Sequence, residues 1–149
     1  MTKTKKGFML AGGIISIVFG AFIALFGLLM MTAIKGMITL DFVEEVLINS
    51  GMAGQYTTEE LEAVVAIYQA LCSLIGFFCI CLAVGSIVPA IFVVKNACKG
   101  VSPKGSIITT LVFSVLAGNI VTIAFMIVTL CLKDKPAEQP EQPETIEVQ

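Results

Sequence analysis

Few residues in this sequence carry side chains that could do chemistry. The chain has no His and no Arg, and it shows no acid–base or nucleophile–base constellation of the kind that catalysis uses. Its five Cys residues are an odd set without accompanying His, which predicts neither a disulfide framework nor a metal site. We therefore expect no enzyme, no metal and no cofactor, and we expect the cysteines to act as small apolar fillers.

Asn119 is the polar residue that stands out, because it lies in the middle of a long apolar run. A polar group inside a membrane is a candidate functional site by default. The plainer interpretation is one interhelical hydrogen bond, worth about 1 kcal/mol or less, to a neighbour such as Ser73 or to a backbone carbonyl. We favour the structural interpretation, since no acid, Lys or His lies in the apolar runs to form a proton relay or an ion path.

Hydrophobicity defines the elements that must position these residues. Of the 149 residues 57% are hydrophobic and 13% are charged, whereas a typical globular domain is about 25% charged. Charge is absent from 7–34, 63–94 and 105–132, and each run exceeds the roughly 20 residues that cross about 30 Å of hydrocarbon. The sequence predicts an all-α integral membrane protein, a three-helix bundle with spans at 7–34, within a long helix 58–94, and at 105–132. A net charge of −2 argues against a nucleic-acid binder.

The Lys residues orient the predicted spans, because cytoplasmic connectors carry the excess of positive charge. Segments 1–6 and 95–104 are rich in Lys and are expected inside, and the acidic connector 35–62 is expected outside. Three spans then place the tail, 133–149, outside, although two Lys residues at its start favour the inside. The Pro and Glu content of the tail predicts disorder. The first span is longer than a signal h-region of about 7 to 15 residues, so we expect it to remain as a helix.

Two local patterns shape the outer connector. Apolar and acidic residues separate onto opposite arcs when Leu40–Ile48 is read at 100° per residue, which predicts a short extracytoplasmic helix over 39–50. Its polar side is acidic, so we expect it to pack over the outer end of the bundle rather than to bind lipid. The spacing of Thr57 and Glu60 is that of a capping box, which places the start of the long helix near Thr58.

Prolines mark two further positions. Ser102 followed by Pro103 predicts an N-cap and the first helical residue of the last span. Pro89 lies inside the long helix and removes the hydrogen bond to the Gly85 carbonyl. We expect a kink there, with Ser86 as a substitute partner for the freed backbone.

Small residues at helical spacing predict where helices pack in a membrane, because they let backbones approach closely. The first span carries one row at a period of four and a second row that shares Gly20, and the last span carries a row with hydroxyl groups. These rows are Gly12, Ser16, Gly20 and Ala24; Gly13, Gly20 and Gly27; and Thr110, Ser114, Gly118 and Thr122. The rows could pack a partner, or they could serve only the protein's own bundle.

Three features together characterise the layout: a Lys-rich start that enters a Gly-rich span (Lys5-Lys6-Gly7, Gly12-Gly13, Gly20), the acidic outer segment ending in Tyr56-Thr57-Thr58-Glu59-Glu60-Leu61, and Lys-Gly pairs before the last span. With these features the chain resembles a family of small multi-pass membrane proteins of unknown function from Gram-positive bacteria. The acidic Pro/Glu tail departs from that pattern. The resemblance implies a bacterial cell membrane and no established activity or catalytic residues.

Two readings of function follow. The first is a non-enzymatic association protein in the lipid bilayer, a regulator or accessory subunit that docks a membrane-protein partner or a second copy through the Gly12/Gly20 face. The alternative is an oligomeric pore or small transporter with copies arranged around Thr110, Ser114, Asn119 and Thr122. We prefer the first reading.

Overall fold

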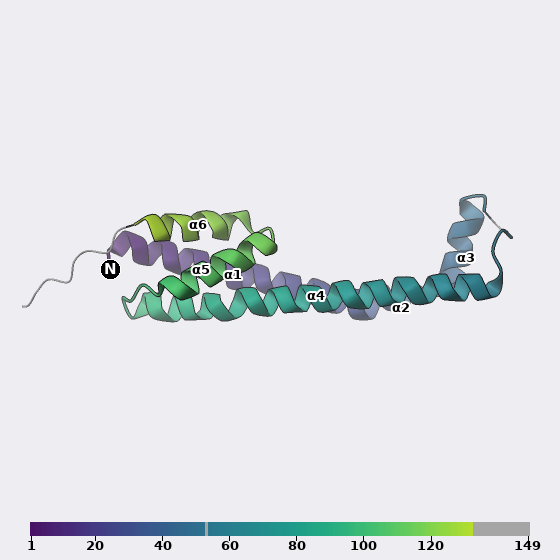
Figure 1. Ribbon diagram of the computed structural model, residues 1–149, viewed down its shortest axis with the longest axis horizontal. Coiled ribbons are helices and arrows are strands. Elements are labelled where there is room, and N and C mark those ends of the chain that lie inside the picture. Colours follow the sequence, from purple (N-terminus) through teal and green to yellow (C-terminus); the bar gives the residue numbers. More distant parts are fainter. Residues whose placement is uncertain (53, 133–149) are drawn as a thin grey trace, which may run out of the picture.

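The computed structural model describes residues 1–52 and 54–132, and this part of the chain is helical, with no strand. Figure 1 shows a rod built on two long helices, with a short helical hairpin at one end and a small crosswise helix at the other. The elements are α1 (Lys3–Leu29), the π-helical turn η1 (Met30–Ile34), α2 (Lys35–Met37), α3 (Leu40–Asn49), α4 (Thr58–Cys98), α5 (Lys104–Leu116) and α6 (Ile120–Cys131).

The rod is an antiparallel pair formed by α4 and the continuous helical stretch of α1, η1 and α2 (Figure 1). Lys3–Met37 and Thr58–Cys98 are both long and apolar enough to cross a membrane by length and composition. Helix α1 begins before the predicted residue 7, because Thr2 caps it by accepting a hydrogen bond from the Lys5 amide, 3.3 Å away. The predicted span was bounded by the charged residues that flank it, but the helix continues through those residues.

Helix α4 begins where the capping box predicted. The Thr57 hydroxyl accepts from the Glu60 amide at 3.3 Å, and the Glu60 carboxylate accepts from the Thr57 amide at 2.7 Å. The helix passes through Pro89 without ending and stops at Cys98, four residues beyond the predicted end at 94. Gly100, with φ of +76°, closes it in the left-handed conformation that glycine adopts at low cost.

The single helix predicted over 105–132 is wrong, because the structure holds two helices there. Gly118 takes a φ of +70°, and the amide of Asn119 donates to the Ser114 carbonyl at 2.8 Å while that of Gly118 donates to Val115. These bonds satisfy the last carbonyls of α5 as a glycine-terminated Schellman motif does. The Asn119 side chain then caps α6 by accepting from the Thr122 amide at 3.1 Å. A helix stop and a helix start therefore meet within three residues.

The turn sends α6 back along α5, so that residue 132 lies at the end of the rod where α1 begins (Figure 1). There the Lys5 ammonium donates to the Leu132 carbonyl at 3.0 Å. The three-span arrangement had placed residue 132 at the opposite end from residue 1, and that part of the prediction is wrong. The predicted disordered tail, 133–149, lies outside the described residues.

The start of the last span also differs from the prediction by one position. Pro103 is the N-cap residue of α5, and no side chain caps this helix. Ser102, predicted to be the cap, keeps its hydroxyl oxygen buried without a hydrogen-bond partner. The ring of Pro103 fixes the backbone just before the first turn, and the helix starts at Lys104 without help from the Ser102 hydroxyl.

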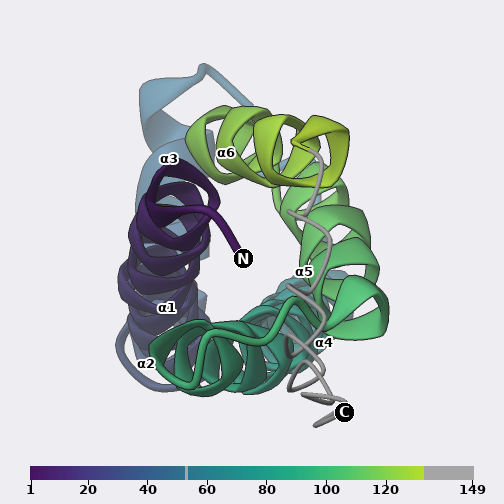
Figure 2. The ribbon, with the colours of Figure 1, turned by 90° about the vertical axis from the view of Figure 1, so that its left-hand side faces the viewer.

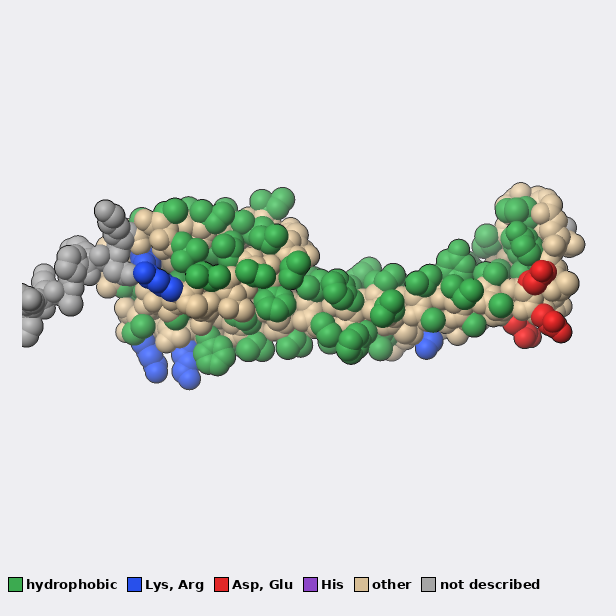
Figure 3. All heavy atoms as spheres, viewed as in Figure 1, with side chains coloured by type: hydrophobic (Ala, Val, Ile, Leu, Met, Phe, Trp, Pro, Cys, Tyr) green, Lys and Arg blue, Asp and Glu red, His purple; other side chains and the backbone are tan. Residues whose placement is uncertain are grey.

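Helix α3 confirms the short amphipathic helix predicted over 39–50. Thr39 caps it by accepting from the Phe42 amide at 3.3 Å, and it lies across the far end of the rod beside α4 (Figure 1). In Figure 3 acidic side chains gather at this end of the molecule, and Lys side chains gather at the opposite end. The two ends of the rod therefore carry opposite charge.

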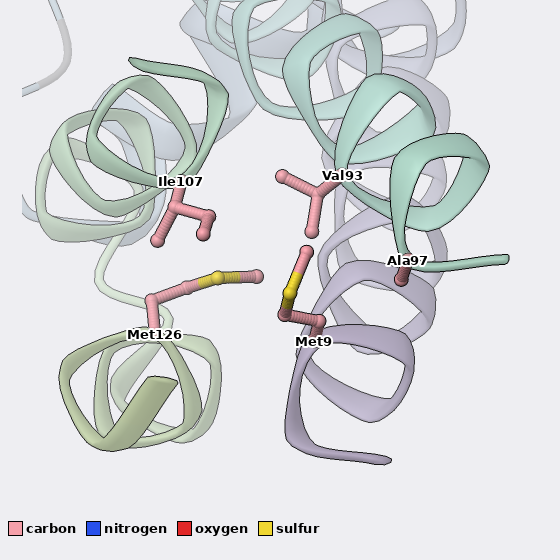
Figure 4. Close-up of a cluster of buried hydrophobic side chains, with 5 residues drawn as sticks. All are labelled: Met9, Val93, Ala97, Ile107 and Met126. Atoms are coloured by element: carbon pink, nitrogen blue, oxygen red, sulfur yellow. The ribbon is translucent and has the colours of Figure 1, made fainter. Parts of the chain in front are cut away.

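Four helices share the Lys-rich end. Figure 2 looks along the rod from this side and shows α1, α4, α5 and α6 arranged around a common axis. Five of their fully buried apolar side chains form one cluster (Figure 4), composed of Met9, Val93, Ala97, Ile107 and Met126. This half of the rod has a side-chain core, whereas the other half consists of the helix pair and α3.

Candidate functional site

The small-residue face of α1 is used inside the chain. A Cβ atom added at Gly13 would lie 2.6 Å from the Val94 side chain, and one at Gly20 would lie 2.6 Å from Ile87. At Gly12 the neighbour is Phe125 on α6, at 2.9 Å. The rows predicted from the sequence therefore mark real close contacts, and the surfaces they contact belong to α4 and α6 of the same chain.

The tightest backbone contact lies in the two-helix half of the rod. A Cβ atom at Gly27 would lie 2.8 Å from the Gly76 carbonyl oxygen, and one at Gly76 would lie 2.6 Å from the Gly27 carbonyl oxygen. Gly76 and Gly85 were missed by the sequence analysis, which considered small residues on the first and last spans only. Gly85 faces the ring of Phe113 on α5.

The other predicted packing residues divide into two groups. Ser16, Thr110, Ser114 and Thr122 are all buried within the four-helix half of the rod. Ala24 is only half-buried, and Gly118 is exposed at the turn between α5 and α6. The prediction that Gly118 belongs to a packing face is wrong, because its role is to supply the left-handed backbone of the turn.

Asn119 is buried, but it is not a mid-helix amide that bonds to another helix. Its side-chain oxygen accepts from the Thr122 amide and so caps its own helix. Ser73, named as one example of an interhelical partner beside a backbone carbonyl, is not the partner of Asn119: its hydroxyl donates to the Gln69 carbonyl of α4 at 2.9 Å. Asn is among the residues that favour the N-cap position, which explains why an amide stands in this apolar run.

Close contacts place four hydroxyl residues, one from each helix, in the same segment of the bundle. The Ser16 hydroxyl of α1 donates to the Ser86 carbonyl of α4 at 3.4 Å. Gly12 faces Met126, so Ser16, one turn further along, comes level with Thr122 of antiparallel α6. Ser114 precedes the Gly118 turn by the distance at which Thr122 follows it. We call Ser16, Ser86, Ser114 and Thr122 the hydroxyl layer.

Three members of the hydroxyl layer lack hydrogen-bond partners. The oxygens of Ser86, Ser114 and Thr122 are buried and unbonded, and these residues are 2%, 1% and 0% exposed. Ser86 was predicted to bond the backbone freed by Pro89, and that prediction is wrong. An unpartnered buried polar group costs about 1–3 kcal/mol. The layer therefore holds three hydroxyls for which the described protein atoms supply no hydrogen-bond partner.

The hydroxyl layer lies between a buried apolar cluster and the α5–α6 turn. Towards the Lys-rich end lies the cluster that contains Met9 and Met126 (Figure 4). Towards the other end the bundle stops at the α5–α6 turn, where Leu116 and Ile120 are exposed. The hydroxyl layer thus occupies the last turns of the four-helix region before the rod narrows to two helices.

A second site lies in the corner between α3 and α4. A cavity of about 260 Å³ there is lined by Ile38, Phe42, Val43, Val46, Leu47, Val64 and Tyr68. The Gln69 side chain fixes the corner by donating to the Ile38 carbonyl at 2.8 Å. In the described residues no group of His, Cys, Asp or Glu could hold a metal ion. The corner is therefore an apolar cavity beside an acidic edge.

In the first turn of α4, hydrogen bonds shift the pKa of one carboxyl group. The amide and hydroxyl of Thr57 both donate to the Glu60 carboxylate, and these hydrogen bonds lower the pKa of Glu60 below its ordinary value. The charged form of Glu60 thus stabilises the start of the helix.

Comparisons with known proteins give no relative: no family model, curated protein or solved structure matches this chain.

Proposed function

We propose that the chain is an integral membrane protein in which α1 and α4 span the bilayer and the α5–α6 hairpin enters and leaves on the same side. Helix α5 has 13 residues and rises about 20 Å, which is too short to cross about 30 Å of hydrocarbon. Its turn supplies acceptors for most of its backbone donors, because the amides of 117–120 and 122 donate to oxygen atoms, and backbone inside a membrane needs such partners. The exposed tip residues, Leu116 and Ile120, are apolar.

The charge distribution supports one orientation of this arrangement. The Lys-rich end holds Lys3, Lys5, Lys6, Lys95, Lys99 and Lys104, and it is assigned to the cytoplasm. Residue 132 lies at that same end. The two Lys residues that follow it in the sequence therefore fit the excess of positive charge expected in cytoplasmic segments, which they did not fit in the three-span arrangement. Helix α3 then lies crosswise to α4 at the outer end of the helix pair.

The function that this arrangement supports best is that of a non-enzymatic accessory or regulatory subunit that associates with another membrane protein. One observation carries this proposal: the hairpin covers the α1–α4 pair only in the half of the rod at the Lys-rich end (Figure 1), which we call the inner half, and leaves uncovered the half that carries α3, the outer half. Phe78 and Leu71 lie about two and four turns from Gly85 on the face of α4 that meets α5, and both are exposed. Phe26 lies about four turns from Gly12 on the corresponding face of α1 and is also exposed. We call Phe26, Leu71 and Phe78 the open flank.

The partner surface proposed here differs from the one expected from the sequence. The Gly12/Gly20 face is covered by the chain's own helices and offers nothing to a partner. The open flank is continuous with the surface on which the protein's own hairpin packs, and a partner helix that enters there would extend the four-helix arrangement to the outer half.

Photo-crosslinking in the native membrane tests the association. A photoreactive residue at Phe78 is expected to give a protein adduct of one defined mass, whereas the same residue at Ile127, exposed on the hairpin, is expected to label lipid only. Phe26→Ala is expected to reduce the adduct formed at position 78, and Ile127→Ala to leave it unchanged. Lipid adducts alone at both positions would refute the association through the open flank.

The pore reading gains no support from the geometry. Thr110, Ser114, Asn119 and Thr122, the residues expected to line it, are all buried within a single chain. Copies of the protein could not share these residues around a central channel without opening the bundle. We therefore advance no pore.

A further inference from the structure

We infer that the hydroxyl layer is a binding site for buried water molecules, held by Ser86, Ser114 and Thr122 between α4, α5 and α6. The inference goes beyond the proposed association and does not depend on it, since it concerns the interior of the four-helix half. It rests on the hydrogen-bonding pattern of the buried Ser and Thr side chains.

The hydroxyls of the layer differ from those of the other buried threonines in their hydrogen bonding. Thr110 and Thr129 are 0% exposed, and their hydroxyls donate to the carbonyls of Ser106 and Phe125 at 2.8 Å. A helix therefore offers a Ser or Thr hydroxyl an acceptor one turn back. Thr122 is equally buried, but it lies in the first turn of α6, where the residue one turn back is Gly118 outside the helix, and its hydroxyl makes no hydrogen bond. Ser86 and Ser114 lie within α4 and α5, and their hydroxyls also make no hydrogen bond.

Backbone chemistry adds an acceptor to the layer. Pro89 has no N–H group, so the Gly85 carbonyl lacks the helical donor four residues later. This carbonyl belongs to the residue before Ser86, and the Gly85 backbone lies directly against Phe113 of α5. Three hydroxyls without protein partners and a carbonyl without its regular helical donor thus lie where α4 meets α5 and α6.

The chemistry of the site favours water over a charged ligand. Each hydroxyl can donate one hydrogen bond and accept others, which matches a molecule that does both. The described residues of the layer include no carboxylate and no Lys, so a cation would lack charge neutralisation and an anion would lack a positive donor. Buried waters in proteins make about three hydrogen bonds to groups that are otherwise unsatisfied, and this site offers that number of hydroxyls.

Methyl NMR of the full chain in nanodiscs tests the site directly. With Thr methyl groups labelled, the Thr122 methyl is expected to show a water cross-peak, and the methyls of Thr110 and Thr129 are expected to show none. These two threonines are matched controls, because they are as buried as Thr122 but satisfy their hydroxyls within their own helices. The absence of a cross-peak at Thr122, or equal cross-peaks at all three, would overturn the inference.

A triple variant, Ser86→Ala, Ser114→Ala and Thr122→Val, provides an independent readout. If water satisfies the hydroxyls, removing them eliminates those hydrogen bonds, and the Tm is expected to fall by a few degrees. A rise in Tm would show that the wild-type hydroxyls are dry and would refute the site. Exchanging Na⁺ for choline is expected to leave the wild-type Tm unchanged, and a Na⁺-specific increase would overturn water in favour of a cation. If the variant does not fold, the wild-type cross-peak still decides.

Discussion

The two halves of the rod solve the packing of α1 against α4 in different ways. In the inner half the α5–α6 hairpin completes a four-helix arrangement with a Met-rich core and buried hydroxyls (Figures 2 and 4). In the outer half the pair stands alone, and Gly27 and Gly76 bring the two backbones together. The outer half thus depends on backbone proximity, and the inner half depends on side chains from four helices.

The same contrast explains how the hairpin is positioned. Phe113 contacts the position where Gly85 lacks a side chain, and Phe125 contacts Gly12. The Phe113 ring therefore fits against Gly85, and the Cβ atom of Phe125 lies against Gly12. Beyond the turn the corresponding faces carry Phe78 and Phe26 in place of glycine, and both side chains are exposed.

The largest expected effect concerns the side of the membrane on which a reporter fused after Gln149 lies. A reporter that is active only in the cytoplasm is expected to be active when fused after Gln149 and inactive when inserted after Gly54, because residue 132 returns to the Lys-rich end. An inactive Gln149 fusion would restore the three-span arrangement. It would also show that the hairpin does not form in the membrane.

A second prediction separates the two halves by stability. Gly27→Ala places a methyl group against the Gly76 carbonyl, which cannot rotate away, and is expected to cost about 1–3 kcal/mol. Thermal unfolding in nanodiscs measures the loss, and hydrogen exchange is expected to accelerate in the outer half but not in α6. Gly7→Ala is the matched control on the same helix, since nothing lies within 4 Å of its Cβ. Equal Tm values for the two variants would contradict the predicted contact.

Much of this architecture could be predicted from the sequence, and the limits of that prediction have a physical cause. Capping of α4 by Thr57 and the extent of α3 depend on neighbouring residues only, and both were predicted correctly. The division of 105–132 was missed because apolar length alone does not reveal a turn. Gly118 followed by Asn119 was the available signal, a helix-stop residue directly before a helix cap, but the repeat of small residues concealed it.

The hydroxyl layer required the fold as well as the sequence. Ser16, Ser114 and Thr122 were recognised as packing residues, but their assembly at one level depends on the return of α6. Ser86 was considered only as a partner for the backbone near Pro89. No periodicity within one helix could indicate that three helices would bring unpartnered hydroxyls into one segment.

A third prediction tests whether the turn sets the length of the four-helix half. Gly118→Ala introduces a side chain at a φ of +70°, and the left-handed conformation costs about 1–2 kcal/mol for a residue with a Cβ. The Tm is expected to fall, and exchange of the Asn119 and Thr122 amides is expected to accelerate. Gly105→Ala in α5, where nothing lies within 4 Å, is the control. An unchanged Tm for Gly118→Ala would indicate that residues 117–119 are helical, as in a continuous span.

The smallest expected effect lies at the acidic end, where the start of α4 is held by a charge. Hydrogen bonds from Thr57 lower the pKa of Glu60 below the ordinary 4.5, so the ionised carboxylate stabilises the first turn. A depressed pKa means that this stability is present above about pH 4.5 and is lost as the pH falls through the folded value. Carboxyl NMR titration is expected to give a midpoint below 4.5 for Glu60, and Thr57→Val is expected to raise that midpoint. Identical midpoints in both proteins would show that Thr57 does not hold the charge, and the outer half would then lack this local support.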